Sequence, residues 1–210
     1  PASLTKIMTE FVVFSELKAG RIKLSDELTV SRKARLMGGS RMFLEAGSRV
    51  PIEAVLKGVI VQSGNDASVA IAEHVGHGVD SFAVLMNQHA SSLGMTGSHF
   101  VNPHGLPHPE HYTTARDMAK LARALIARFP RLYAWHSMQS FEHNGIKQKN
   151  RNRLLWSDGS VDGVKTGFTE AAGYCLVASA KRSGMRLISV VMGTKSAKER
   201  IADSKKLLDF

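Results

Sequence analysis

The sequence predicts an α/β (α+β) fold, in which helices and a helical subdomain flank an antiparallel sheet. Apolar residues recur at three- and four-residue steps over residues 2–19, which predicts an opening helix that Gly20 ends. Two runs rich in Val, Leu and Ile, 173–180 and 185–192, are separated by four polar or small residues, which predicts a hairpin. The predicted helices come mainly before the predicted strands along the chain, and this order favours an α+β fold over a doubly wound parallel sheet.

The remaining elements follow from the same signals. We expect helices over 52–62 and 66–75, separated by a turn at Ser63-Gly64-Asn65, and a further amphipathic helix over 80–93. Thr114 to Asp117 resembles a capping box for a helix that ends near Arg128, with Pro130 as its stop. A short strand over 161–167 precedes the hairpin, and 197–208 returns to helical spacing.

Composition bounds the class of protein. The chain has 210 residues, no apolar run near the length of about 20 that a membrane span needs, and no signal-peptide pattern at its start. The net charge is +10, and the basic residues occur singly or in pairs along the chain. This distribution argues against nucleic-acid binding and suits an anionic envelope polymer or lipid surface as a partner. The single cysteine, Cys175, excludes an internal disulfide and is expected to be a buried, inert thiol.

The first chemical signal is Ser3-Leu4-Thr5-Lys6, which places a hydroxyl and an amine on one face of a helix. The spacing alone is weak, because Ser15 and Lys18 repeat it in the same helix. A serine nucleophile needs a neighbouring base, and Lys6 can act as that base only when its amine is neutral. Burial and a second cation, for which we expect Lys165, would both lower the pKa of Lys6.

Two further motifs accompany the first. Ser63-Gly64-Asn65 lies 60 residues after Ser3, and Lys165-Thr166-Gly167 follows 102 residues later. Alone, each motif is typical of a turn or a strand end, but the ordered trio is typical of penicillin-binding proteins and class A β-lactamases. Ser63 is suited to relay a proton to the leaving amine, and the Asn65 amide can hold Lys6 and the substrate.

With these motifs, the chain resembles the low-molecular-mass penicillin-binding proteins of the D-alanyl-D-alanine carboxypeptidase family. The resemblance covers essentially the whole chain and includes the following segments: Pro1-Ala2-Ser3-Leu4-Thr5-Lys6, Gln62-Ser63-Gly64-Asn65-Asp66-Ala67, Ala115-Arg116-Asp117, Asn150-Arg151-Asn152, Val161-Asp162-Gly163-Val164-Lys165-Thr166-Gly167 and Ser204-Lys205-Lys206-Leu207-Leu208. It implies a DD-peptidase/β-lactamase-like fold for residues 1–210 as a catalytic domain.

The resemblance also implies roles for individual residues. The backbone N–H groups of Ser3 and Phe168 would form an oxyanion hole. Lys165 and Thr166 would bind the terminal carboxylate of the substrate, and Gly167 would let the peptide approach the strand. Three further candidates would border the same site: Arg151, Arg200 and His104. We expect Arg200 in the segment just before the last helix.

A metal site is the alternative reading of the loop that carries His104, His108, Glu110 and His111. Three prolines make this loop irregular, and no ligand pair has the helical spacing of a His-Glu-x-x-His motif. We therefore expect solvated loop histidines, no metal and no cofactor.

The predicted reaction is acyl transfer through Ser3, which removes the terminal D-alanine from peptidoglycan stem peptides; β-lactam antibiotics would acylate the same serine. Three alternatives remain: a class A-like β-lactamase, although no Glu-x-x-Leu-Asn pattern is found; a DD-endopeptidase; and a non-catalytic β-lactam sensor.

The substrate places the protein in the periplasm, at the outer face of the cytoplasmic membrane. Relatives carry two strands and a helix before the nucleophile, and many carry a β-rich domain and an anchor helix after the catalytic domain. We therefore expect the domain to lack its N-terminal strands and any C-terminal domain here, with an exposed sheet edge. Peripheral membrane association would depend on a segment absent from this sequence.

Overall fold

A computed structural model describes all 210 residues of the chain. Its helical elements are η1 (Ala2–Leu4), α1 (Thr5–Lys18), α2 (Arg32–Arg35), α3 (Ile52–Lys57), η2 (Gly58–Gln62), α4 (Asn65–Gly76), α5 (Val79–Ser92), α6 (Ala115–Arg128), α7 (Pro130–Tyr133), η3 (Ala134–Ser137), α8 (Leu154–Ser157) and α9 (Ala197–Leu208). Its strands are β1 (Glu27–Thr29), β2 (Arg49–Pro51), β3 (Ser140–His143), β4 (Ile146–Lys149), β5 (Val161–Thr169), β6 (Gly173–Arg182) and β7 (Met185–Thr194).

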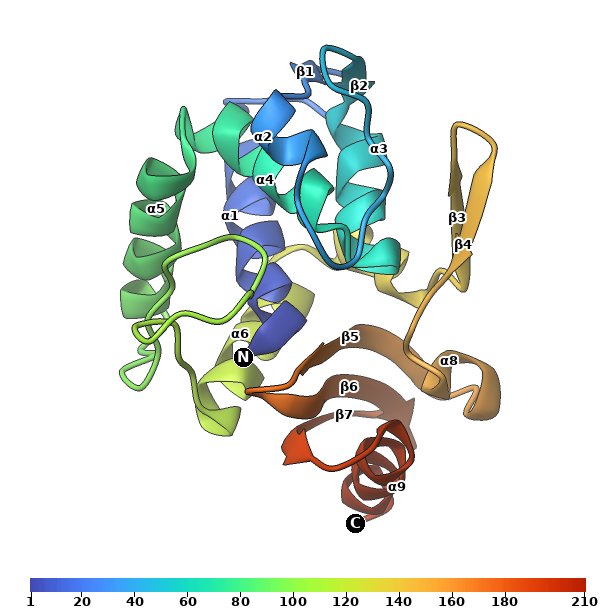
Figure 1. The fold of residues 1–210 in the computed structure, drawn as a ribbon. Coiled ribbons are helices and arrows are strands. Elements are labelled where there is room, and N and C mark those ends of the chain that lie inside the picture. Colours follow the sequence, from blue (N-terminus) through green and yellow to red (C-terminus); the bar gives the residue numbers. More distant parts are fainter.

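The elements form a helical part above a sheet, with α9 beneath it (Figure 1). The sheet has the antiparallel order β5-β6-β7, so β5 is an edge strand, and it is the strand nearest to α1. The pairs β1-β2 and β3-β4 form separate two-stranded ribbons, and β3-β4 projects to one side of the molecule. No helix is both long enough and apolar enough to cross a membrane.

Strand β6 separates two hydrophobic cores. Cys175 and Val177 pack into the large core with the helical part, while Leu176 and Ala178 pack with Leu208 of α9 into a small one. Successive side chains of a strand point to opposite faces, so a strand covered on both faces reads as a continuous apolar run. The antiparallel sheet and its hairpin are thus confirmed, as is the buried thiol of Cys175.

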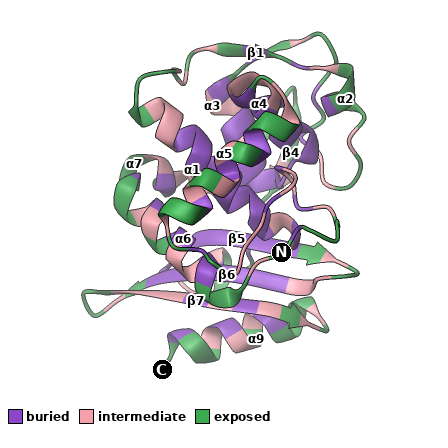
Figure 2. Cartoon of the chain, turned by 90° about the vertical axis from the view of Figure 1, so that its left-hand side faces the viewer, coloured by how far each residue is buried: buried purple, intermediate pink, exposed green.

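Helix α1 runs through the middle of the helical part, and every residue from Thr5 to Phe14 is buried (Figure 2). A helix that is buried on all sides has no polar face turned to solvent. Lys6 and Glu10 are therefore ionisable side chains inside the core, and both must find polar partners there.

Several boundaries differ from the sequence prediction. Helix α6 ends at Arg128, as predicted, and Pro130 then begins the short helix α7, because proline is well tolerated in the first turn of a helix. Thr114 caps α6 as expected, but the Asp117 carboxylate accepts from Gly97 N–H rather than completing a capping box. The segment 58–62 is a π-helix, and Arg200 lies inside α9, not before it.

Asp66 connects α4 to the loop that crosses the front of the helical part. Its buried carboxylate accepts hydrogen bonds from the backbone N–H groups of Met42 and Leu44, at 2.8 and 3.1 Å, and from its neighbour Ala67. The loop preceding Met42 reaches the turn at Ser63-Gly64-Asn65, where Asn65 N–H donates to Ser40 C=O. One carboxylate therefore fixes a loop that borders the candidate site.

We predict that D66N destabilises the fold by about 1–3 kcal/mol, because the amide oxygen can still accept from Met42 and Ala67, while the new NH2 group faces the Leu44 N–H, which stays buried and unpaired. Urea unfolding of D66N and wild type measures the difference in free energy of unfolding. The matched control is D26N, since Asp26 accepts from a single exposed backbone N–H. Equal losses in the two variants would contradict this account of Asp66.

Candidate active site

A cavity of about 470 Å³ lies where α1, the turn before α4, the loop after residue 103 and the edge strand β5 meet. Nine of the eleven candidate site residues line it: Ser3, Ser63, Asn65, His104, Arg151, Thr166, Gly167, Phe168 and Arg200. The other two, Lys6 and Lys165, lie buried behind its wall. The structure therefore brings together every residue that the sequence singled out.

The Lys6 amine is the central hydrogen-bonding group of this site. Its Nζ lies 3.0 Å from Ser3 Oγ, 2.7 Å from Asn65 Oδ1 and 2.7 Å from the backbone oxygen of His104. The three partners come from η1, α4 and a loop 98 residues away in sequence. Lys6 is fully buried, so its amine is shielded from bulk solvent.

The partners of Lys6 determine how the amine can act on Ser3. The Asn65 and His104 oxygens can only accept, so a neutral amine uses its two hydrogens on them. Its lone pair then faces Ser3 Oγ, and the serine hydroxyl becomes the donor of that hydrogen bond. The geometry thus suits removal of the serine proton by a neutral Lys6.

Electrostatics favour this neutral form. Burial, and then the positive charge of Lys165, lower the pKa of Lys6 well below its usual range. Burial also lowers the pKa of Lys165 to about 7, and Arg151 and Arg200 act in the same direction. The expectation that burial and Lys165 together lower the pKa of Lys6 agrees with the structure.

The turn between η2 and α4 presents Ser63 and Asn65 to the cavity. Ser63 has a left-handed backbone, with φ of 60° and ψ of 34°, and its buried Oγ has no hydrogen-bond partner. Asn65 begins α4, and its amide N–H donates to Gly38 C=O at 2.7 Å while its oxygen receives Lys6. An unpaired hydroxyl at the cavity wall is available to a ligand.

Close backbone contacts set the distance between β5 and Ser3. A Cβ on Gly167 would lie 3.2 Å from Leu4 N, so a larger residue would push the strand away from η1. A Cβ on Gly105 would lie 1.8 Å from Ala2 O, and the φ of Gly105 is +88°. Only glycine fits both constraints at position 105, and the loop that accepts the Lys6 hydrogen bond depends on it.

Aromatic and cationic side chains line the far end of the cavity. The Phe168 and Tyr174 rings have centroids 4.2 Å apart, and the Arg200 guanidinium lies 5.5 Å from the Tyr174 ring. Arg200 also donates to Gly167 C=O, while its Nε has no partner. Since Lys165 is behind the wall, Thr166 and the two arginines are the groups there that can meet an anionic ligand directly.

Sequence reasoning missed part of the cavity wall, namely Gly39, Ser40, Thr169 and Tyr174. Gly38-Gly39-Ser40 was the available signal for one of these segments, because a Cβ on Gly39 would lie 2.8 Å from Asn65 Nδ2. The repeated spacing at Ser15 and Lys18 forms no second site. Ser15 Oγ donates to Phe11 C=O, and Lys18 Nζ lies near Arg128 C=O instead.

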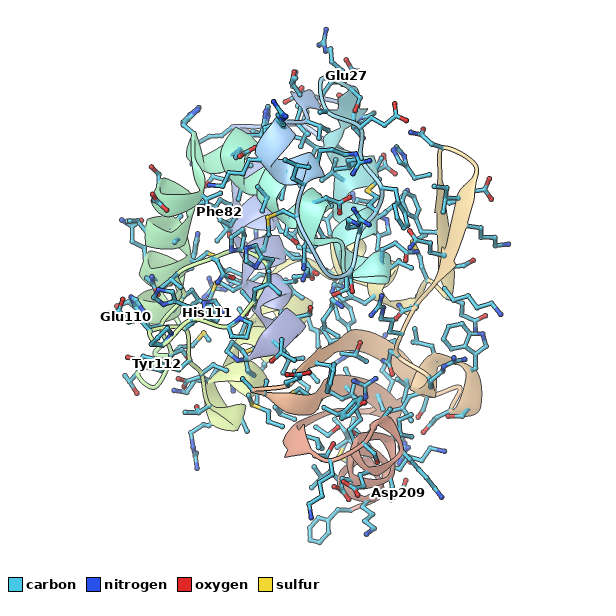
Figure 3. All side chains as sticks on the ribbon, viewed as in Figure 1. Glu27, Phe82, Glu110, His111, Tyr112 and Asp209 are labelled. Atoms are coloured by element: carbon cyan, nitrogen blue, oxygen red, sulfur yellow. The ribbon has the colours of Figure 1, made fainter.

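The loop histidines differ from one another. His108 and Glu110 are exposed, as expected for solvated side chains, but His111 is buried, so that expectation is wrong for His111. Figure 3 shows His111 directed from its loop toward the start of α1. There its Nε2 lies 2.7 Å from Thr5 Oγ1, and its Nδ1 accepts from Val101 N–H. No group of three or more His, Cys, Asp or Glu side chains is placed to hold a metal ion.

Comparison with known proteins identifies the family. The family model described as D-alanyl-D-alanine carboxypeptidase matches residues 1–196. The chain belongs to this family. It is 52% identical to D-alanyl-D-alanine carboxypeptidase DacC and 46% identical to DacA, both of Escherichia coli K12. Each comparison covers 100% of this chain and 54% of the relative, so the chain spans about half the length of the curated relatives it matches.

Solved structures of penicillin-binding proteins share the fold. Penicillin binding protein 5 from Haemophilus influenzae matches with a TM-score of 0.97 and 47% identity, over 100% of this chain and 62% of that one. Penicillin-Binding Protein D2 from Listeria monocytogenes, in its ampicillin-bound form, matches with a TM-score of 0.89 and 29% identity, over 100% and 85%. The DD-peptidase fold predicted from the sequence is confirmed.

We predict that acid destabilises the protein through His104 and His111. Burial lowers their pKa values to about 4 and about 3, whereas the unfolded chain takes up these protons near 6.5. The unfolded state therefore binds more protons below pH 6.5, and stability falls as the pH drops toward the folded pKa values. Urea unfolding at pH 7 and pH 4.5 should show a smaller loss for H111N than for wild type.

The exposed His108 supplies the control for this prediction, because H108N should lose as much stability between the two pH values as wild type does. An H111N variant with the full wild-type loss would contradict the assignment to His111.

Proposed function

We propose that this chain is the catalytic domain of a serine-type D-alanyl-D-alanine carboxypeptidase that acts on peptidoglycan stem peptides and is acylated by β-lactams. The observation that carries the proposal is the buried Lys6 amine 3.0 Å from Ser3 Oγ, at the wall of a cavity. Family membership and the names of the relatives support the substrate class. Such a substrate places the native protein outside the cytoplasmic membrane.

In the acylation step, Ser3 Oγ attacks the carbonyl carbon of the penultimate D-alanine while its proton passes to Lys6 Nζ. The backbone N–H groups of Ser3 and Phe168 stabilise the negative oxygen that forms. The C–N bond then breaks, the leaving amine takes up a proton through Ser63, and the terminal D-alanine departs. An ester between the shortened peptide and Ser3 remains.

In the deacylation step, water attacks this ester and gives its proton to Lys6, and Ser3 Oγ recovers a proton as the acid leaves. Lys6 is the base in both steps, because none of the residues that line the cavity is an Asp or Glu. A class A β-lactamase uses a carboxylate to activate the deacylating water. The composition of the cavity wall therefore favours a carboxypeptidase over a β-lactamase.

The carboxylate end of the substrate would lie against Thr166 and Arg200, with Arg151 nearby. Lys165 would act from behind the wall, where its charge disfavours a proton on Lys6. Gly167 keeps the edge of β5 open to the peptide backbone, and His104 contributes its carbonyl to Lys6 and its ring to the cavity wall.

Mass spectrometry after incubation with benzylpenicillin tests the nucleophile. We predict a covalent adduct of one benzylpenicillin on Ser3 in wild type and none in S3A, because alanine has no hydroxyl to acylate. S15A is the matched control, since Ser15 has the same spacing to a lysine in the same helix, and it should be acylated like wild type. Folded wild-type protein without an adduct would contradict the proposal.

The release of D-alanine from a stem pentapeptide then separates the alternatives. A carboxypeptidase releases it, a sensor is acylated without releasing it, and an endopeptidase prefers a cross-linked dimer. Sustained hydrolysis of benzylpenicillin would identify a β-lactamase.

We predict that R200Q lowers kcat/KM for the pentapeptide roughly 10- to 100-fold, mainly through KM. Arg200 would hold the terminal carboxylate in the substrate and transition state alike, and a charge-assisted hydrogen bond contributes about 1.5–3 kcal/mol. Steady-state kinetics measures the change. R49Q is the control, because Arg49 is exposed and pairs with Glu27 on the surface. An unchanged KM in R200Q would contradict the assignment of Arg200 to binding of the substrate carboxylate.

A further inference from the structure

Behind the catalytic wall lies a buried acid–base pair, Glu10 and His136, that the reaction above does not use. Both side chains are fully buried, and Glu10 Oε2 lies 2.8 Å from His136 Nε2. The other carboxylate oxygen, Oε1, is buried without any hydrogen-bond partner. A buried carboxylate that is only half satisfied costs stability, so its presence here needs an explanation.

The hydrogen bonds of His136 fix the number of protons in this pair. His136 Nδ1 lies 2.9 Å from the backbone oxygen of Tyr133, which can only accept, so Nδ1 carries a hydrogen. Nε2 faces a carboxylate, which needs a second hydrogen between the two groups. The pair therefore holds one proton more than a neutral histidine and a free carboxylate would. We assign it as a carboxylate and an imidazolium, with Glu10 as the negative end.

The pair bridges the two elements that carry the catalytic lysines. Glu10 follows Lys6 by four residues on α1, so the two side chains share one face of that helix. His136 lies on η3, which packs against β5; a Cβ on Gly163 would lie 3.0 Å from His136 Cβ. Lys165 is two residues further along β5. The Tyr133 ring stacks on the His136 ring, with the two centroids 4.9 Å apart.

The charges that face this region are almost all positive. Lys6, Lys165, Arg151 and Arg200 converge from α1, β5, the loop after Asn150 and α9. Two acids oppose them. Asp66 of α4 raises the pKa of Lys6 only weakly, and its oxygens already receive three backbone N–H groups. The Glu10 carboxylate is the strongest influence that favours the charged form of both lysines.

We propose that Glu10, held in place by His136, is a positioning residue of the active site: its buried carboxylate, on the helix face that carries Lys6, sets the pH range in which Lys6 can act on Ser3. The inference rests on the function proposed above, because it concerns the lysines of that reaction. Without this carboxylate, Lys6, Lys165 and Arg200 would share a buried region in which only Asp66 opposes them.

The variant E10Q tests this role with little change of shape. The glutamine amide has the size of the carboxylate, and its N–H can donate to Nε2 of a neutral His136, so the link between α1 and η3 remains. The measurement is the second-order rate of Ser3 acylation by benzylpenicillin between pH 5 and pH 10. We expect the whole profile of E10Q to move to lower pH by roughly one unit, because both lysines lose the negative end of the pair, which lies on the helix of Lys6, while the positive charge that is lost with it lies on η3.

A second variant, H136Q, makes the opposite change. Its amide still donates to the Glu10 carboxylate but no longer balances the negative charge, so the profile should move to higher pH. Opposite displacements in the two variants are a readout that a purely structural role does not produce. E16Q is the matched control, because Glu16 lies on the surface end of the same helix and its removal should leave the profile in place.

The outcomes separate this inference from the proposed function. If wild-type protein is not acylated at all, the function fails and the inference falls with it. If wild type is acylated but E10Q and H136Q keep its pH profile, or both move it in one direction, the inference alone is overturned. Thermal unfolding of each variant confirms that the rates refer to folded protein, and either variant by itself still gives a displacement of predicted sign.

Discussion

The burial of the Lys6 amine is the constraint on which the rest of the site depends. A charged lysine in a protein core is unfavourable, so this position requires either a partner for each N–H or the loss of a proton. The structure meets both conditions, because three oxygens surround Nζ and two of them can only accept. Each oxygen comes from a different part of the chain, so the fold must be assembled before the base exists.

Backbone geometry, more than side-chain identity, holds these parts at the right distance. Gly105 and Gly167 allow the loop and the edge strand to approach η1, and the left-handed Ser63 turns its hydroxyl into the cavity. The Asp66 carboxylate holds the loop around Met42 by accepting hydrogen bonds from the backbone N–H groups of Met42 and Leu44. These contacts join segments that are far apart in sequence and fix the polar groups around the cavity before a ligand binds, which is the condition for preorganised charge in a catalytic site.

The sequence predicted the opening helix, the terminal hairpin, the last helix and the residues of the three motifs, because periodicity and motif order are local signals. It could not predict which of these residues line the cavity and from which element. Lys165 is buried behind the cavity lining, and Arg200 reaches the cavity from within α9. Nor could it reveal Glu10 and His136, which are 126 residues apart and meet only in the folded core. The β3-β4 ribbon and the aromatic pair of Phe168 and Tyr174 also depend on tertiary contacts.

The central claim is that folding makes Lys6 a neutral base beside Ser3, and a direct titration tests it. Nuclear magnetic resonance of protein labelled at the lysine side chains, with K6R to assign the signal, reports the protonation of Lys6 against pH. The account predicts a Lys6 pKa well below the usual lysine value of 10.5, because of burial and then Lys165. A Lys6 signal that titrates near 10.5 in the folded protein would contradict it.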